Sequence, residues 1–323
     1  MSADSNTKIP IWLDCDPEFH PKLNLLGISA VHGNTSIENT FKNASRVLNA
    51  CGVSDVKVYK GAHKPLIRTR EDAAHIHGET GLDGSDILPG PDVSLLEHKV
   101  NCFEAMRDAI LSSPQPVVLA AVGPLTNIAI LVMTYPEVTS NVREVLIMGG
   151  GIGTGNVTAV AEFNIYADPE ALQVVLQAEF RKVVMVPLNC TCLSNYTKEI
   201  QQRFTDMASK INPTFTQMIN ELTGFVRKSY IGYGLDPNMI SWHDAIAIAH
   251  VVAPEGKYED VDMKVTCVYG NCSGVAQGET IGDRRAPENE KNCTVVMGMD
   301  TEHFWTEMFE AWRLAAMSSK LSQ

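Results

Sequence analysis

The sequence contains no long hydrophobic run, no internal repeat and no low-complexity linker. No apolar stretch reaches the roughly 18 residues that a membrane-spanning helix needs. The first ten residues, MSADSNTKIP, are polar and lack the apolar core of a secretory signal. We therefore expect a cytoplasmic protein with no membrane partner.

Positive charge is scarce, because 26 lysines and arginines stand against 38 aspartates and glutamates, for a formal net charge of −12. Basic residues form no dense cluster along the chain. A surface of this sign repels the phosphates of nucleic acids and of anionic membranes. A small neutral molecule is therefore the expected partner, and nucleic acid is not.

Several functional signatures are also missing. The eight cysteines include no CxxC pair, since one residue separates Cys190 from Cys192. This spacing argues against a zinc or dithiol redox site and favours buried thiols in a reducing compartment. The glycines at 149–151 have neither the G-x-G-x-x-G order nor a GKS or GKT ending. The sequence therefore predicts neither dinucleotide binding nor a P-loop.

Apolar runs alternate with helix-like segments along the chain. Several runs are continuously apolar, which is typical of parallel strands buried on both faces. The predicted strands are Ile11–Asp14, Leu23–Val31, Val56–Tyr59, Val117–Val122, Val145–Met148, Val183–Leu188, Met263–Tyr269 and Thr294–Met297. The predicted helices are one from a capping box at Thr35–Glu38 to Gly52, and Leu125–Tyr135, Pro169–Ala178, Lys198–Ile211, Phe215–Tyr230, His243–Val252 and Glu302–Ser318. This order predicts one α/β domain over residues 1–323, with a mostly parallel open sheet and helices on both faces.

Polar residues gather where the predicted strands end, which is where open α/β sheets bind ligands. Asp14 and Asp16 end the first strand, and Asn34 follows the second. Further candidates in later segments are His75, His77, Asn156, Glu162, Asn164, His243 and Asp244. Carboxylates and amides in such numbers suit a hard cation and a polyhydroxyl ligand. Each residue also has an ordinary structural interpretation; Asp244, for example, could simply cap the helix that follows it.

Eight segments, taken together, resemble the inosine–uridine nucleoside hydrolase family. They are IPIWLDCDP, LLGISAVHGN, HIHGETGLDG, VGPLTNIA, IMGGGIGTGN, AEFNIYADPEA, VPLN and WHDAIAI, and they span nearly the whole chain. The resemblance implies the family's single-domain fold and hydrolysis of the N-glycosidic bond of purine or pyrimidine ribonucleosides, such as inosine or uridine, to ribose and free base. It also implies a bound Ca²⁺ and a homodimer or homotetramer.

The same resemblance implies roles for individual residues. Asp16 resembles a metal ligand and general base, and His243 the acid that protonates the leaving base, given the ordinary histidine pKa of about 6.5. Asp244 and the backbone carbonyl of Val122 would be further metal ligands. Asp14 would contact the ribose or support the metal. Ribose contacts are implied for Asn34, Asn156, Glu162 and Asn164, and base contacts for His77, Phe163, Tyr230 and Tyr233.

The chain departs from the family at its opening motif. The family reads Asp-x-Asp-Pro-Gly-x-Asp-Asp-Ala and continues into a helix, whereas here Glu18 follows Pro17 directly. About a dozen residues, the length of a crossover helix, are absent, so the first βαβ unit is truncated and a bidentate calcium ligand is lost. We therefore expect the first two strands not to pair in parallel without strain. We also expect the segment before Pro21 to be displaced and an apolar sheet face to be uncovered.

Such a clean excision favours a mis-spliced gene model or a splice variant over adaptive loss. Three functions stay open: a hydrolase weakened by the missing pair, a catalytically silent nucleoside- or ribose-binding relative, and a structural or interaction protein. The retained polar residues favour the first two. Both require Asp16, Asp244 and Asn164 to share one cavity.

Overall fold

The computed structural model describes residues 8–14, 22–270 and 274–321. Within them one sheet has the strand order β4-β3-β2-β1-β5-β6-β7-β10-β8-β9. The strands are β1 Ile9–Asp14, β2 Leu23–Ala30, β3 Val58–Lys60, β4 Leu96–Glu97, β5 Val117–Ala121, β6 Val142–Met148, β7 Val183–Val186, β8 Asp260–Cys267, β9 Thr280–Asp283 and β10 Cys293–Val296. Pairing is parallel from β4 across to β10 and antiparallel where β8 joins β10 and β9. The prediction of a mostly parallel open sheet in one α/β domain is confirmed.

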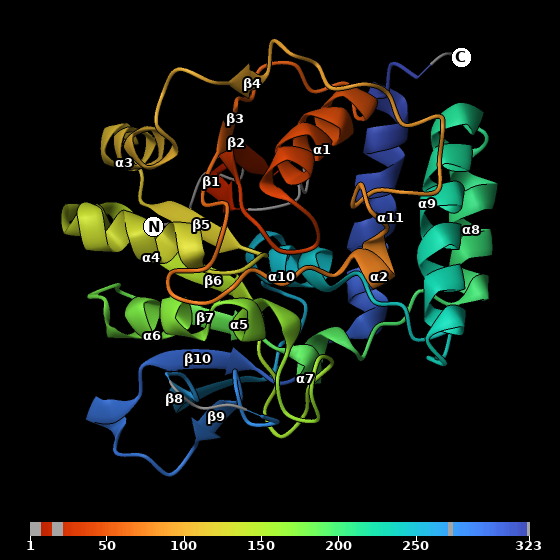
Figure 1. Ribbon diagram of the computed structural model, residues 1–323. Coiled ribbons are helices and arrows are strands. Elements are labelled where there is room, and N and C mark those ends of the chain that lie inside the picture. The colour runs from red at the N-terminus through yellow and green to blue at the C-terminus, as the bar shows by residue number, and fades with distance from the viewer. Residues whose placement is uncertain (1–7, 15–21, 271–273, 322–323) are drawn as a thin grey trace.

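Helices cover both faces of the sheet (Figure 1). On one face lie α3 Cys102–Ser112, α4 Thr126–Thr134 and α6 Pro169–Gln177, and on the other α1 Ile37–Ala50, α10 His243–Val252 and α11 Thr301–Ser318. Outside α11 pack α8 Lys198–Ala208 and α9 Pro213–Gly232. The short helices are α2 Ala74–His77, α5 Phe163–Ala167 and α7 Leu188–Thr191, with 3-10 turns η1 Pro136–Asn141 and η2 Glu288–Glu290. No helix among the described residues is long and apolar enough to cross a bilayer.

Two hydrophobic cores explain the continuously apolar strands. In β1, the side chains of Ile11 and Leu13 belong to the core beneath α1, α10 and α11, while Trp12 between them belongs to the core beneath α3, α4 and α6. Successive side chains of a strand point to opposite faces, so a strand covered on both sides is apolar at every position.

β1 and β2 pair in parallel, contrary to our expectation from their short connection. Ile9 lies opposite Leu23 and Asp14 opposite Ser29, with a register shift inside the pair. The end of β1 and the start of β2 are therefore about five residues apart along the strands, or roughly 17 Å. The eight peptide bonds from Asp14 to Lys22 can span up to about 26 Å when extended. The chain is therefore long enough to connect the end of β1 to the start of β2 without a helix between them.

The expected uncovering of the sheet is also not observed. On the face shared with α1, Ile11 and Leu13 are each 1% exposed and Ile28 is fully buried. The helices of that face, α10 and α11 among them, belong to the same core as these strands. Residues 15–21, on which the predicted displacement and Asp16 fall, lie outside the described residues.

α1 begins one residue later than the predicted capping box. Ser36 is its N-cap and accepts a hydrogen bond from the backbone N–H of Asn39 at 3.3 Å. Thr35, the predicted cap, instead donates its hydroxyl to the carbonyl of Glu79 at 2.9 Å. This bond ties the loop that follows α2 to the start of α1.

Candidate active site

The sheet reverses its direction of growth at β1, which has β2 on one side and β5 on the other. Such a switch point, at the carboxyl ends of the strands, is where open α/β sheets bind ligands. Here the backbone N–H of Val122 donates to the carbonyl of Asp14 at 3.1 Å. Two of the predicted site residues are thus adjacent through their backbones.

A cavity of about 490 Å³ lies at this edge, a size typical of small-molecule sites. Most of the predicted site residues line it: Asn34, His77, Val122, Asn156, Glu162, Phe163, Asn164, Tyr230, Tyr233, His243 and Asp244. Asp14 is fully buried beside Val122. The requirement of a shared cavity is met for Asn164 and Asp244, whereas Asp16 lies outside the described residues.

Glu162 is held by three backbone donors. It is the N-cap of α5, and its carboxylate accepts hydrogen bonds from the N–H groups of Asn164 (3.0 Å), Ile165 (3.3 Å) and Gly150 (2.9 Å). Gly150 has a φ of 79°, a left-handed conformation that favours glycine. Burial raises the pKa of Glu162 to about 7, against the opposing effect of the three N–H groups. The carboxylate is therefore fixed in one orientation at the cavity wall.

Asn164 connects the ends of β5 and β6. Its side-chain nitrogen donates to the carbonyls of Val122 (3.2 Å) and Met148 (3.0 Å). Since the nitrogen is used within the protein, Oδ1 is the atom that a ligand can reach. Asn156 has the opposite arrangement, because its Oδ1 accepts from the N–H of Phe163 at 2.9 Å. The cavity thus offers one amide as an acceptor and the other as a donor.

Asp14 is a buried carboxylate with one oxygen satisfied. Oδ1 accepts from the hydroxyl of Ser29 and from the amide of Asn127, at 2.5 and 2.7 Å. Oδ2 is buried and has no hydrogen-bond partner among the described residues. Burial, partly offset by those two bonds, raises the pKa of this carboxyl to about 7. A cation beside Oδ2 would supply the missing partner and keep the group ionised.

The ligand atoms available at this site are of the type that a hard cation binds. Asp14, the Val122 carbonyl and Asp244 offer only oxygen, the ligand atom that Ca²⁺ prefers. They supply fewer than the six to eight oxygens that Ca²⁺ usually takes, so Asp16, water and ligand hydroxyls would have to provide the rest. A site of this kind is expected to bind the ion weakly.

Asp244 is not a helix cap. The N-cap of α10 is Trp242, which makes no side-chain capping bond, and Asp244 lies in the first turn with its side chain at the cavity. A carboxylate there is favoured by the positive end of the helix dipole. The interpretation of Asp244 as the helix cap is therefore wrong.

His243 departs from its ordinary titration. Its Nδ1 lies 2.7 Å from the hydroxyl of Thr191 on α7. Burial, and secondarily His77, lowers the pKa of the imidazole to about 4. The expectation of a pKa near 6.5 was wrong, because the sequence did not reveal how deeply the ring is enclosed. At neutral pH the ring is uncharged and acts through hydrogen bonds.

Aromatic and imidazole rings also line the cavity. His77 on α2, Phe163 on α5 and Tyr230 near the end of α9 lie along it, and Tyr233 at the end of α9 is 60% exposed. Burial lowers the pKa of His77 to about 4. His75, to which we assigned no role, also lines the cavity and packs edge-on against Tyr233, with ring centroids 5.1 Å apart.

Sequence reasoning missed the residues that support the site. Ser29, Asn127 and Thr191 are fully buried and bond to Asp14 or His243. Trp242 lines the cavity next to His243. All four stand within or beside the segments that suggested the family, and that proximity was their only signal.

A pocket at the switch point of an α/β sheet, lined by carboxylates and amides as well as aromatic rings, has the composition typical of a small-molecule binding site. A family model described as inosine-uridine preferring nucleoside hydrolase matches residues 11–306. The chain therefore belongs to the inosine-uridine preferring nucleoside hydrolase family, and by that membership is classed among the N-glycosyl hydrolases.

Relatives and solved structures agree with this family. An uncharacterised protein of Schizosaccharomyces pombe is 37% identical over 310 residues, covering 91% of each chain. The inosine-uridine preferring nucleoside hydrolase of Leishmania major is 33% identical, covering 93% of this chain and 96% of its own. The pyrimidine-specific ribonucleoside hydrolase RihB of Escherichia coli O1:K1 is 32% identical, covering 92% and 95%. The structure of a purine-preferring ribonucleoside hydrolase from Gardnerella vaginalis superimposes with a TM-score of 0.83 at 25% identity, covering 95% and 99%.

Proposed function

We propose that this chain binds purine or pyrimidine ribonucleosides and hydrolyses their N-glycosidic bond to ribose and free base. One observation carries the proposal: Asn156, Glu162 and Asn164 line the same cavity as Val122 and Asp244, and aromatic side chains line it too. Fixed carboxylate and amide oxygens suit a sugar diol, and flat rings suit a nucleobase.

We further propose Ca²⁺ as the cofactor, held by Asp14, Asp16, the Val122 carbonyl and Asp244. When bound, such an ion orients two ribose hydroxyls and acidifies a water molecule. Oδ2 of Asp14, which is buried without a hydrogen-bond partner in the described part of the chain, supports this assignment.

The chain's own residues would perform the remaining steps. The glycosidic bond breaks through an oxocarbenium-like state. Asp16 would accept the proton of the attacking water. Glu162, held by its three N–H donors, would accept a hydrogen bond from a ribose hydroxyl, and Asn34, Asn156 and Asn164 would bind the other hydroxyls.

The nucleobase would be held by His77, Phe163, Tyr230 and Tyr233. We assign the proton of neutral His243 to Nε2, with the hydroxyl of Thr191 donating to Nδ1. The imidazole then offers a hydrogen bond to the departing base, and water would complete its protonation.

The missing Asp-Asp pair would make calcium binding weak and turnover slow, since charge count tunes calcium affinity. This absence also favours a second function, a silent nucleoside- or ribose-binding relative that retains the sugar-facing residues. We propose a cytoplasmic homodimer or homotetramer in either case. The described cysteines are all free thiols, which supports a reducing compartment.

Ribose release from inosine and from uridine, measured during a calcium titration, tests the proposal. We expect slow release that saturates only well above micromolar calcium and is lost in Asp244→Asn. Asp55→Asn, which removes an exposed carboxylate, should leave it unchanged. Robust turnover at micromolar calcium would contradict the proposal that the calcium site is weakened. No turnover with measurable ribose binding would favour the silent relative.

A further inference from the structure

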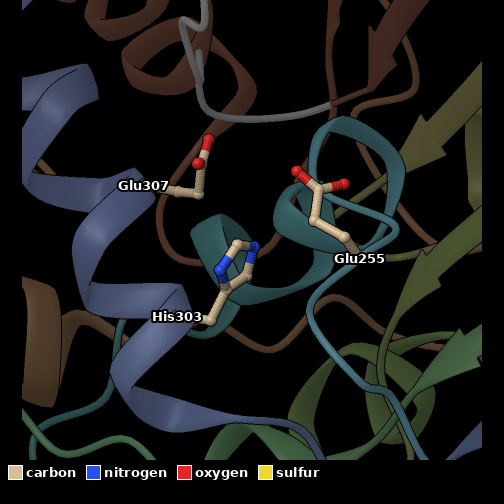
Figure 2. Close-up of side chains that lie close together, drawn as sticks. All are labelled: Glu255, His303 and Glu307. Atoms are coloured by element: carbon tan, nitrogen blue, oxygen red, sulfur yellow. The ribbon is translucent and has the colours of Figure 1, made fainter.

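α10 has the candidate active site at its start and a different cluster beyond its end. Glu255 follows its last turn by three residues, and His303 and Glu307 on α11 face Glu255. Figure 2 shows the imidazole of His303 between the two glutamate side chains. α10 rises by about 15 Å over its length, so this cluster lies at the opposite edge of the sheet from the cavity.

The three side chains carry the donor atoms of a metal site. One ligand atom from each lies within 4.8 Å of the other two. His303 and Glu307 are four residues apart on one helix, a spacing that places both on the same face. One imidazole nitrogen with two carboxylates suits borderline ions such as Zn²⁺, with bonds of about 2.0–2.2 Å. Small rotations of the glutamates would bring the oxygens to that distance.

One imidazole nitrogen of His303 is buried without a partner. Nε2 exposes less than 1 Å² and makes no hydrogen bond among the described residues. A buried polar atom in this state costs free energy. The two glutamates are more accessible, with side chains 59% and 23% exposed at Glu255 and Glu307, which leaves an entry path for an ion.

A lysine already interacts with this cluster. The ammonium of Lys22 lies 3.3 Å from a carboxylate oxygen of Glu307, 4.0 Å from one of Glu255 and 2.9 Å from the carbonyl of Val252 at the end of α10. One positive charge thus faces two carboxylates and the negative end of a helix dipole. Lys22 offsets only one of the two carboxylate charges, and an ion that binds here must displace or tolerate this lysine.

We propose that Glu255, His303 and Glu307 bind a divalent transition-metal ion of the Zn²⁺ class, with Lys22 as its built-in competitor. The site is independent of nucleoside hydrolysis, and it combines an imidazole nitrogen with carboxylates, whereas the proposed calcium ligands Asp14, Val122 and Asp244 offer only oxygen. The alternative is an ion-pair cluster with no metal function. In that case the removal of Lys22 would leave the two carboxylates unpaired and would not tighten zinc binding.

Zinc titration of the metal-stripped, full-length protein by calorimetry, in excess Ca²⁺ to saturate oxygen-only sites, tests the proposal. Glu255→Gln and His303→Gln should each weaken zinc binding by at least tenfold. Lys22→Gln should tighten it by roughly tenfold, because a like charge is removed from beside the ion. Glu302→Gln, on an exposed position of α11, is the matched control and should bind like the wild type.

The outcomes separate cleanly. Equal zinc affinity in the wild type and Glu255→Gln would overturn the site, and this exposed variant is expected to fold. Unchanged or weaker zinc binding in Lys22→Gln would show an ion-pair cluster only. Ribose release plays no part in either measurement, so loss of the proposed hydrolase activity would leave this inference unaffected.

Discussion

The side-chain amide of Asn127 joins the carboxylate of Asp14 to the chain beyond β3. Its nitrogen donates to Asp14 Oδ1 at 2.7 Å and to the carbonyl of Ala30 at 3.0 Å, while its oxygen accepts from the N–H of Ala62 at 2.8 Å. Asn127 is fully buried. One side chain therefore fixes the orientation of a candidate metal-site carboxylate and a neighbouring loop at the same time.

Replacing Asn127 with alanine should lower the free energy of unfolding by about 3 kcal/mol, because hydrogen bonds to Asp14, Ala30 and Ala62 are lost at a buried position. Urea denaturation measures the change. Asn49→Ala removes an amide that makes one exposed bond, to the carbonyl of Gly90, and should cost less than about 0.5 kcal/mol. Equal losses in the two variants would show that the buried amide has no special role.

Thr191→Val should reduce kcat/KM for nucleosides by roughly tenfold, because valine matches the shape of threonine but cannot hydrogen-bond Nδ1 of His243. Thr191→Ser keeps the hydroxyl and should retain most of the activity. Steady-state ribose release measures both. If the valine and serine variants are equally active, Thr191 does not position the imidazole.

Acid should destabilise the fold through His32. Its Nε2 lies 2.9 Å from the hydroxyl of Thr126, which itself donates to Asp168 at 2.6 Å, and its Nδ1 is buried without a partner among the described residues. Burial, assisted by Arg70 and His63, lowers the pKa of His32 to about 4. Between about pH 6.5 and 4 the unfolded chain binds a proton that the folded protein does not, so stability falls as the pH falls.

His32→Gln retains a donor for Thr126 and removes the titration. Over that pH range, the variant should lose about 3 kcal/mol less of its unfolding free energy than the wild type. Urea titrations from pH 4.5 to 7.5 compare the slopes. His98→Gln, at an exposed histidine that does not contribute to the His32 shift, should keep the wild-type slope, and an unchanged slope in His32→Gln would rule out this source of acid sensitivity.

Restoring the absent ligands should strengthen calcium binding. A helix-forming insert that carries Gly-x-Asp-Asp between Pro17 and Glu18 should raise calcium affinity by at least tenfold relative to the same insert with Asn-Asn, since only carboxylates add charge and bidentate oxygens. Calorimetric calcium titration of the two inserts isolates the ligands from the helix. Equal affinities would show that this pair is not what limits the site.

Much of the fold was predictable because the relevant signals are local. Buried parallel strands such as β5 and β7 are continuously apolar, and α10 starts and ends at the predicted residues. Elements with weak local signals were missed: β4 has two residues, β9 has four, and α3 follows a long loop with only Asn101 as its N-cap. The antiparallel placement of β8 depends on its pairing with β10, which periodicity cannot reveal.

The gathering of the candidate residues at one cavity was predictable, and their electrostatics were not. Motifs placed Asn164 and Asp244 in one set, and the structure places both at one cavity. The neutral state of His243 and the burial of the Asp14 carboxylate depend on enclosure by residues far away in the chain, such as Thr191 and Asn127. The pairing of β1 with β2 was predicted wrongly. We applied a statistical rule on the length of crossover connections, whereas the maximum span of the connecting residues determines whether the two strands can pair.

That pairing has a consequence for how this architecture can change. The sheet and the cavity form although the family's Asp-Asp pair is absent, so a stretch that carries cation ligands can be lost while the other cavity residues stay together. A single in-frame deletion could therefore convert an enzyme of this architecture into a protein that only binds the same molecules. No unfolded variant would be needed as an evolutionary intermediate.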